Sequence, residues 1–247
     1  MIRNALPLMV LSGCASIAMA QQFPVWERLL SHYSGKTDET PVPSMKMGWH
    51  MQMSLKADPA PGDSARAAQI LAAAGAVLSR YRDVKTAVHD GYKPFFPTGR
   101  IGEEIHYTNY RYRREEQKQV DYNRPGSLLY KRTAEGLTAV GVMYTAPADA
   151  LPVQLDAIAP LSIATWHRHV DFCGGPKNLP MSEQFGPSAR FGPQGSIHSE
   201  EECKAAQGLW IPVVLNWMTH VYPNAQEEWG GMDMDLEAGA PDAGSAR

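Results

Sequence analysis

The sequence predicts an α+β fold in which N-terminal helices pack on a mostly antiparallel β-sheet within a single domain. Residues 65–90 carry alanine and aliphatic side chains at helical spacing. Later segments are either continuously apolar or alternate apolar with polar residues, and turn-forming residues separate them. This pattern is typical of strands joined by hairpins. No change of composition divides the 247 residues, so we expect one hydrophobic core.

The N-terminus has the pattern of an export signal. Basic Arg3 precedes the apolar run 5–11, which is too short to span a bilayer. Two processing sites compete: cleavage after Ala20, or a lipobox that would leave a lipid anchor on Cys14. Residues 15–20 stay apolar where a lipoprotein usually begins a polar tether, which favours a signal peptide over 1–20. We expect a periplasmic or secreted protein, with a lipoprotein as the alternative.

Charge and hydropathy exclude two classes of partner. The signal peptide contains Arg3 as its one charged residue, so the remaining chain has 22 basic and 26 acidic side chains and a net charge of −4. This balance is not the footprint of a nucleic-acid-binding protein. No later apolar run approaches the roughly 20 residues that a membrane helix needs. The sequence identifies no protein partner.

The N-terminal extension, residues 21–62, combines a short amphipathic helix over 23–33 with a methionine-rich stretch. In one extended strand the methionines would share a face: Met45, Met47, Met51 and Met53. Thioethers are ligands for soft Cu(I), but methionine also fills cores without any metal. Both interpretations stay open for this stretch.

Residues 63–223 form the predicted α+β domain. Asp63 or Ser64 is expected to cap a long helix over 65–81, and a second helical segment over 82–90 ends at Gly91. Further elements are a strand over 104–110, a charged loop or helical excursion over 111–119, and a hairpin of strands 128–132 and 137–144. The second hairpin strand is apolar on both faces, which predicts a central position.

The second half of the domain contains an extended connection over 146–161, a strand over 166–173 and a long loop over 174–198. The Ser199-x-x-Glu202 spacing is a capping box that opens a helix ending near Gln207. Residues 209–223 return to apolar β character. The acidic, Gly/Ala-rich tail over 224–247 is expected to be disordered.

Cys173 and Cys203 are the two cysteines that remain in the mature chain. In an oxidising compartment two cysteines most often pair, which predicts a disulfide. The alternative is that Cys173 provides a thiolate ligand to a metal beside the histidines that precede it.

The strand over 166–173 carries the strongest chemical signal. Alternation places His167, His169 and Asp171 on one face, so two imidazoles point into the same space. His220 and His106, from other strand-like segments, are candidates for the third and fourth ligand. Asp171 can be a ligand or an acceptor that orients an imidazole ring, and Asn109 can do the latter. The competing interpretation is that these histidines form hydrogen bonds inside a β core.

Several segments together resemble a family of exported bacterial proteins that is uncharacterised. The matching segments are Met45–Gly48, Tyr81–Lys85, Asp90–Tyr92, His106–Tyr110, Ser127–Tyr130, Gly141–Pro147, Trp166–Cys173 and Trp217–Pro223. Within them lie the patterns His-Tyr-x-Asn, Ser-Leu-Leu-Tyr, Trp-His-x-His-x-x-x-Cys and Trp-Met-x-His-Val-Tyr-Pro. The resemblance implies one domain and no particular chemistry.

We therefore expect an exported protein that binds a transition metal ion, copper or zinc, through His106, His167, His169 and His220. One alternative is a mononuclear metalloenzyme that uses the same site with an open coordination position. Another is a metal-free periplasmic binding or scaffold domain. Nucleophile elbows, phosphate loops and dinucleotide fingerprints are missing from the sequence. Glu103 and Glu104 are interpreted as a solvated face.

Overall fold

The computed structural model describes residues 40–95, 101–176, 179–184, 186, 188–226 and 228–230. The predicted signal peptide, the helix over 23–33 and most of the predicted disordered tail lie outside these residues. The described chain is a mixed α/β structure dominated by a nine-stranded sheet whose pairings are antiparallel. This coarser part of the fold prediction is confirmed.

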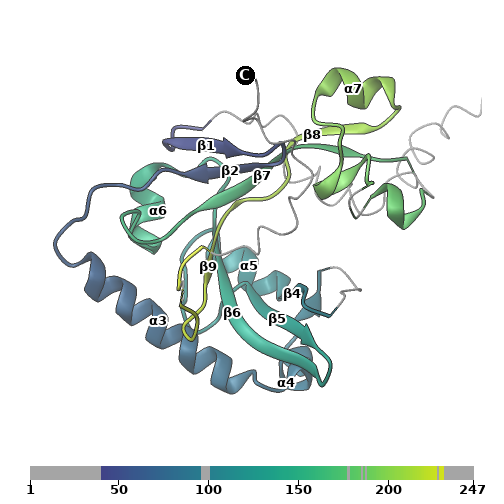
Figure 1. Ribbon diagram of the computed structural model, residues 1–247. Coiled ribbons are helices and arrows are strands. Elements are labelled where there is room, and N and C mark those ends of the chain that lie inside the picture. Colours follow the sequence, from purple (N-terminus) through teal and green to yellow (C-terminus); the bar gives the residue numbers. More distant parts are fainter. Residues whose placement is uncertain are drawn as a thin grey trace, which may run out of the picture.

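The sheet follows the order β1-β2-β7-β9-β6-β5-β4-β3, and β8 pairs with β7 off this path (Figure 1). The strands are β1 (Ser44–Met47), β2 (Met51–Ser54), β3 (Lys93–Pro94), β4 (Glu104–Thr108), β5 (Ser127–Thr133), β6 (Gly136–Ala146), β7 (His167–Gly174), β8 (Leu209–Val213) and β9 (Trp217–Val221). The central position predicted for the second hairpin strand is confirmed, because β6 lies between β9 and β5.

Five helices and two short 3-10 turns connect the strands in the described part of the chain. They are α3 (Asp63–Arg80), α4 (Val84–His89), α5 (Tyr110–Glu116), α6 (Pro152–Ile158), α7 (Glu200–Ala205), η1 (Met181–Glu183) and η2 (Gly192–Gln194). The N-cap of α3 is Gly62 at φ 92°, in place of the expected Asp63 or Ser64. Among the described residues, none of these helices is both long and apolar enough to cross a bilayer.

The main hydrophobic core joins α3 to one face of the sheet. Ile70, Ala74 and Val77 of α3 share a buried cluster with the strand residues Tyr130, Tyr144 and Trp217 and with Trp166, which directly precedes β7. Burying one such large side chain stabilises the fold by about 1.5–3 kcal/mol. Because alternate strand residues point to opposite faces, Leu129, Met218 and His220 point away from this core.

The methionine-rich stretch of the predicted N-terminal extension is a hairpin of the same sheet. Met51 pairs with His169 and Met53 pairs with His167 across β2 and β7. Within the hairpin, Met45 pairs with Met53 and Met47 with Met51. Since directly paired residues point to the same face, the four methionines share the face of the two histidines.

The apolar run over 209–223, predicted to have β character, contains the two strands β8 and β9. The edge strand β8 pairs with β7, and the chain then turns before β9 enters the sheet between β7 and β6. Pro212 fits in β8 because an edge strand tolerates a missing backbone donor. The backbone of Asp171 has a φ of 60°, and the residues on either side of it pair with β8. The alternation of side chains between the two sheet faces therefore stops at Asp171.

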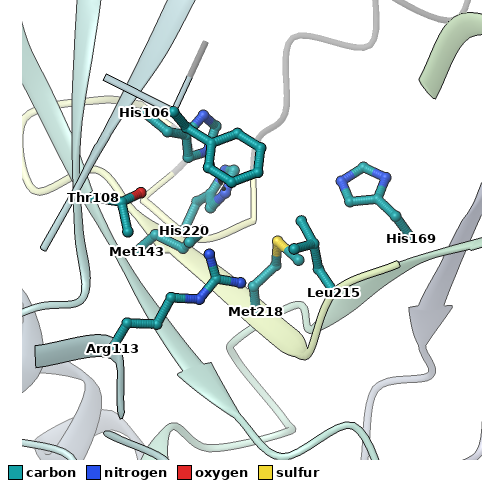
Figure 2. A pocket seen from close by; sticks show the side chains of 9 residues that line it. His106, Thr108, Arg113, Met143, His169, Leu215, Met218 and His220 are labelled. Atoms are coloured by element: carbon teal, nitrogen blue, oxygen red, sulfur yellow. Dashed lines mark hydrogen bonds between the residues drawn. The ribbon is translucent and has the colours of Figure 1, made fainter. Parts of the chain in front are cut away.

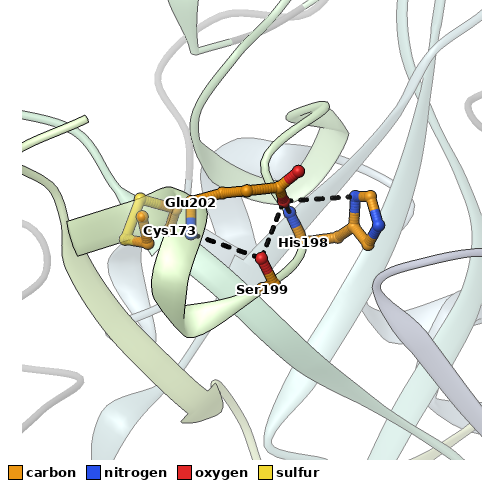
Figure 3. Close-up of a disulfide and its surroundings, with 5 residues drawn as sticks. Cys173, His198, Ser199 and Glu202 are labelled. Carbon is orange, nitrogen blue, oxygen red and sulfur yellow. Dashed lines mark hydrogen bonds and ion pairs between the residues drawn. A yellow bond between two sulfur atoms is a disulfide. The ribbon is translucent and has the colours of Figure 1, made fainter. Parts of the chain in front are cut away.

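The predicted disulfide is confirmed. Cys173 on β7 is bonded to Cys203 on α7, and both residues are fully buried (Figure 3). Ser199 caps α7 by accepting a hydrogen bond from the Glu202 backbone N–H, as its spacing predicts. Cys173 in this bond is not a thiolate, so the alternative of a cysteine metal ligand does not apply to the oxidised protein.

Replacing both cysteines with serine tests how far this bond stabilises the fold. The bond closes a loop with a sequence separation of 30, and the lost constraint on the unfolded chain lowers the free energy of unfolding by about 3–4 kcal/mol. Urea unfolding measures this loss. Wild-type protein in reductant serves as the control and shows the same loss. Coincident unfolding curves for oxidised wild type and variant would contradict the prediction.

A buried carboxyl group anchors α5 to the sheet. Glu116 is 3% exposed, and its carboxyl oxygens accept hydrogen bonds from the Gly126 backbone N–H at 2.6 Å and from Thr145 Oγ1 at 2.7 Å. Burial raises the pKa of Glu116 to about 7, against the opposing effect of these hydrogen bonds. The acid is therefore largely protonated below neutral pH in the folded protein.

The raised pKa of Glu116 makes stability depend on pH. The folded state prefers the neutral acid, so protonation of Glu116 contributes to the free energy of unfolding. This contribution is complete below the unfolded pKa near 4.5 and is lost as pH rises to about 7. Relative to Glu116→Gln, the wild type loses on the order of 2–3 kcal/mol of unfolding free energy between pH 5 and 7.5. Urea unfolding across this range measures the difference. Glu115→Gln, on the exposed side of α5, should leave the pH dependence unchanged, whereas parallel curves for wild type and Glu116→Gln would refute the assignment.

Candidate metal centre

The site forms on the sheet face opposite the α3 core, where β4, β6 and β9 bring distant segments together. His106 pairs with Leu129, and His220 pairs with Met143. Gly141 lies between them on β6, and the ring of Tyr222 packs against it. A Cβ atom at position 141 would lie 2.7 Å from this ring. The missing side chain therefore lets Tyr222 reach across β6 to β4.

Two imidazoles face each other across this part of the sheet. The Nε2 atoms of His106 and His220 lie 3.3 Å apart, although the residues are 114 positions apart in the chain. Two nitrogen ligands at about 2.0–2.1 Å from one tetrahedral metal ion are separated by roughly 3.3–3.4 Å. The carboxylate of Glu104 completes a group whose ligand atoms all lie within 4.8 Å of one another. The spacing of these donors fits one transition metal ion.

A hydrogen-bond chain sets the tautomer of His220. The Tyr222 hydroxyl donates to Glu104 Oε1 at 3.1 Å, which leaves its oxygen free to accept from His220 Nδ1 at 3.1 Å. The proton therefore lies on Nδ1, and Nε2 presents its lone pair toward His106. Metal-binding histidines are commonly oriented in this way by a carboxylate or another acceptor behind the ring.

His106 is neutral at pH 7. Its pKa is lowered to about 4, chiefly by burial and then by the nearby His169 and Arg113. Metal ions compete with protons for imidazole nitrogen. A neutral ring accordingly binds metal without releasing a proton above pH 5.

His167 lies beside this group. Its ring centroid is 4.9 Å from that of His220, it is fully buried, and its Nε2 has no hydrogen-bond partner among the described residues. Burial lowers the pKa of His167 well below its usual value. A buried nitrogen without a partner is unfavourable, so a ligand to Nε2 would relieve that penalty.

A half-enclosed cavity of about 90 Å³ opens next to the histidine pair. Its lining residues are Phe95, His106, Thr108, Arg113, Met143, His169, Leu215, Met218 and His220. Figure 2 shows His106 and His220 together, with His169 across the cavity beyond Met218 and Leu215. Burial lowers the pKa of His169 to about 4, so this ring is also neutral at pH 7.

The four predicted histidine ligands thus occupy one face of the sheet but do not converge on one point. His106 and His220 are in contact, His167 adjoins His220, and the centroid of His169 is 5.8 Å from that of His167. The position of His169 places it on the cavity wall, away from the compact group with Glu104.

The two predicted supporting residues have other partners. The Asp171 carboxylate lies 2.7 Å from Lys46 Nζ. Because the Asp171 backbone has a positive φ, its side chain does not share the face of His167 and His169. The Asn109 side chain caps α5 through the Arg111 and Tyr112 backbone N–H groups and donates to the Asp90 carbonyl. Neither residue orients a histidine through these contacts.

Sequence reasoning missed two residues of the site. Glu104 was interpreted as part of a solvated face, and Tyr222 was not considered. Both could have been found by strand alternation, because Glu104 stands two residues before His106 and Tyr222 two residues after His220.

Comparisons with protein-family models, with curated proteins and with solved structures gave no match. The fold and site define a sheet-based protein with a candidate His/Glu metal group.

Changing Tyr222 to Phe tests the hydrogen-bond chain behind His220. Without the hydroxyl, the His220 tautomer is no longer fixed, and affinity for Zn²⁺ should fall about 10- to 100-fold. Competition with a chromophoric chelator measures the affinity. The exposed Tyr110 provides the control variant Tyr110→Phe, which should bind as the wild type does. Equal affinity in both variants would show that Tyr222 has no part in metal binding.

Proposed function

We propose that this chain is an exported protein that binds one transition metal ion through His106, His220 and Glu104, with His167 as a further ligand. The observation that carries the proposal is the 3.3 Å separation of the two Nε2 atoms. This distance is long for a hydrogen bond between nitrogens but suits two ligands of one tetrahedral ion.

The further ligand is His167 rather than His169. Its Nε2 is buried without a partner among the described residues, and its ring contacts that of His220. His169 instead faces the cavity, where Figure 2 shows it separated from the histidine pair.

The chemistry of the ligands favours copper or zinc. Imidazole suits both ions, and a carboxylate ligand is common for zinc. Two thioethers, from Met143 and Met218, line the adjoining cavity, and thioethers favour Cu(I). The methionines of the β1–β2 hairpin lie on the same sheet face. They place further thioether groups between the site and the sheet edge at β1.

A mononuclear metalloenzyme is the second candidate, and the cavity is the observation that favours it. An ion held by His106 and His220 would border a space of about 90 Å³. An open coordination position beside such a space lets a metal activate water or polarise a bound molecule.

Two features support export. The first residues of the chain have the pattern of a signal peptide, and a buried disulfide joins β7 to α7. Disulfides of this kind persist in oxidising compartments. We place the protein in the periplasm or outside the cell, with a lipid anchor on Cys14 as the alternative form.

Elemental analysis of untagged protein purified from the periplasm tests the proposal. Wild type should contain roughly one equivalent of copper or zinc, and a variant with His106→Ala and His220→Ala should contain background amounts. His89→Ala is the matched control because this histidine is exposed on α4, and it should keep the metal. Background metal in the wild type, with no uptake of added Zn²⁺ or Cu²⁺, would instead support the metal-free binding or scaffold domain.

A further inference from the structure

One charged side chain faces the cavity. Arg113 lies on α5, is half-buried and lines the cavity, and Figure 2 shows its guanidinium extending from the helix into the space near His220. The guanidinium makes no hydrogen bond or ion pair with the described residues, and its charge acts on His106 and on the buried Glu116 carboxyl group. Its neighbour on the helix, Arg111, pairs with Glu115.

The rest of the lining does not neutralise this charge. Phe95, Met143, Leu215 and Met218 are apolar, and the Thr108 hydroxyl is engaged with the Ser127 hydroxyl at 2.9 Å. Of the described residues that line the cavity, Arg113 is the one with a permanent charge. A guanidinium in an apolar wall binds an anion more strongly than one in water, because fewer water molecules compete for its donors.

The helix that carries Arg113 is held firmly in place. Glu116, one turn further along α5, is buried and bonded to the Gly126 backbone N–H and to Thr145. Asn109 caps the start of the helix. These contacts fix the backbone on both sides of Arg113. The Cα atom of Arg113 is therefore held in place beside the cavity.

Size limits what the cavity can take. A bound water needs roughly 10–15 Å³ of such space, so the cavity of about 90 Å³ has room for on the order of six to nine water-sized groups. This volume admits a carboxylate or another small anion.

We propose that the cavity binds a small monoanion, of the size of azide, formate or bicarbonate, between the Arg113 guanidinium and the metal ion at His106 and His220. This inference rests on the proposed metal-binding function and names the ligand class of the same site. The guanidinium donates hydrogen bonds to one end of the anion, and the open position of the metal takes the other end. Arg113, His106 and His220 all line this cavity.

Azide titration into the Cu²⁺-loaded protein tests the inference, with the azide-to-copper charge-transfer band as the signal. In Arg113→Gln, azide affinity should fall about 10- to 100-fold, because one charged hydrogen-bond donor is lost, while the copper content stays at the wild-type value. Arg114→Gln is the matched control: it removes the same charge from the exposed neighbouring position of α5 and should leave azide affinity unchanged.

The outcomes separate the two proposals. Wild type that takes up no copper refutes the metal site and the anion site together. Copper-loaded wild type and Arg113→Gln with equal azide affinity refute the anion site alone. Equal weakening in Arg113→Gln and Arg114→Gln would assign the effect to overall charge and would also overturn the role of Arg113. Arg113→Lys separates charge from geometry, and we expect an azide affinity between those of wild type and Arg113→Gln.

Discussion

The register of the antiparallel sheet is the constraint on which the candidate site depends. A slip of one residue moves every side chain of a strand to the opposite face. On β9, such a slip would bury His220 against α3 and expose Trp217, which is fully buried in the main core. Tyr144 on β6 and Tyr130 on β5 restrict their strands in the same way. The core on one face therefore holds the histidines on the other.

A second constraint is the small residue at position 141. Gly141 leaves space on β6 that Tyr222 fills, and Tyr222 in turn links His220 to Glu104. A larger residue would displace the Tyr222 ring and separate the members of this chain. The nitrogen that faces His106 is thus selected by an interaction on the far side of the His220 ring. Packing and proton position are coupled here through one tyrosine.

Local sequence patterns predicted the features that depend on local periodicity. The long helix, the central strand β6, the N-cap at Ser199 and the β-strand that carries His167 and His169 all follow from spacing along the chain. The disulfide followed from compartment chemistry and the number of cysteines. The same alternation rule places Glu104 on the face of His106 and Tyr222 on the face of His220.

Other features depend on contacts between distant segments. The contact of His106 with His220 joins β4 to β9 across β5 and β6, and no local pattern gives that distance. Asp171 left the predicted histidine face because its backbone takes a positive φ opposite the edge strand β8. Arg113 lies in the segment predicted as a charged loop or helical excursion. Its position at the cavity follows from the burial of Glu116, a non-local contact with Gly126 and Thr145.

Anomalous diffraction from crystals of the full chain soaked with Zn²⁺ or Cu²⁺ tests the central claim most directly, because it locates the ion independently of affinity or activity. The structure predicts one strong peak at about 2.0–2.1 Å from the Nε2 atoms of His106 and His220, with Glu104 or His167 adjacent. A peak at the methionines of the β1–β2 hairpin, or none near the unchanged histidine pair, would contradict the account.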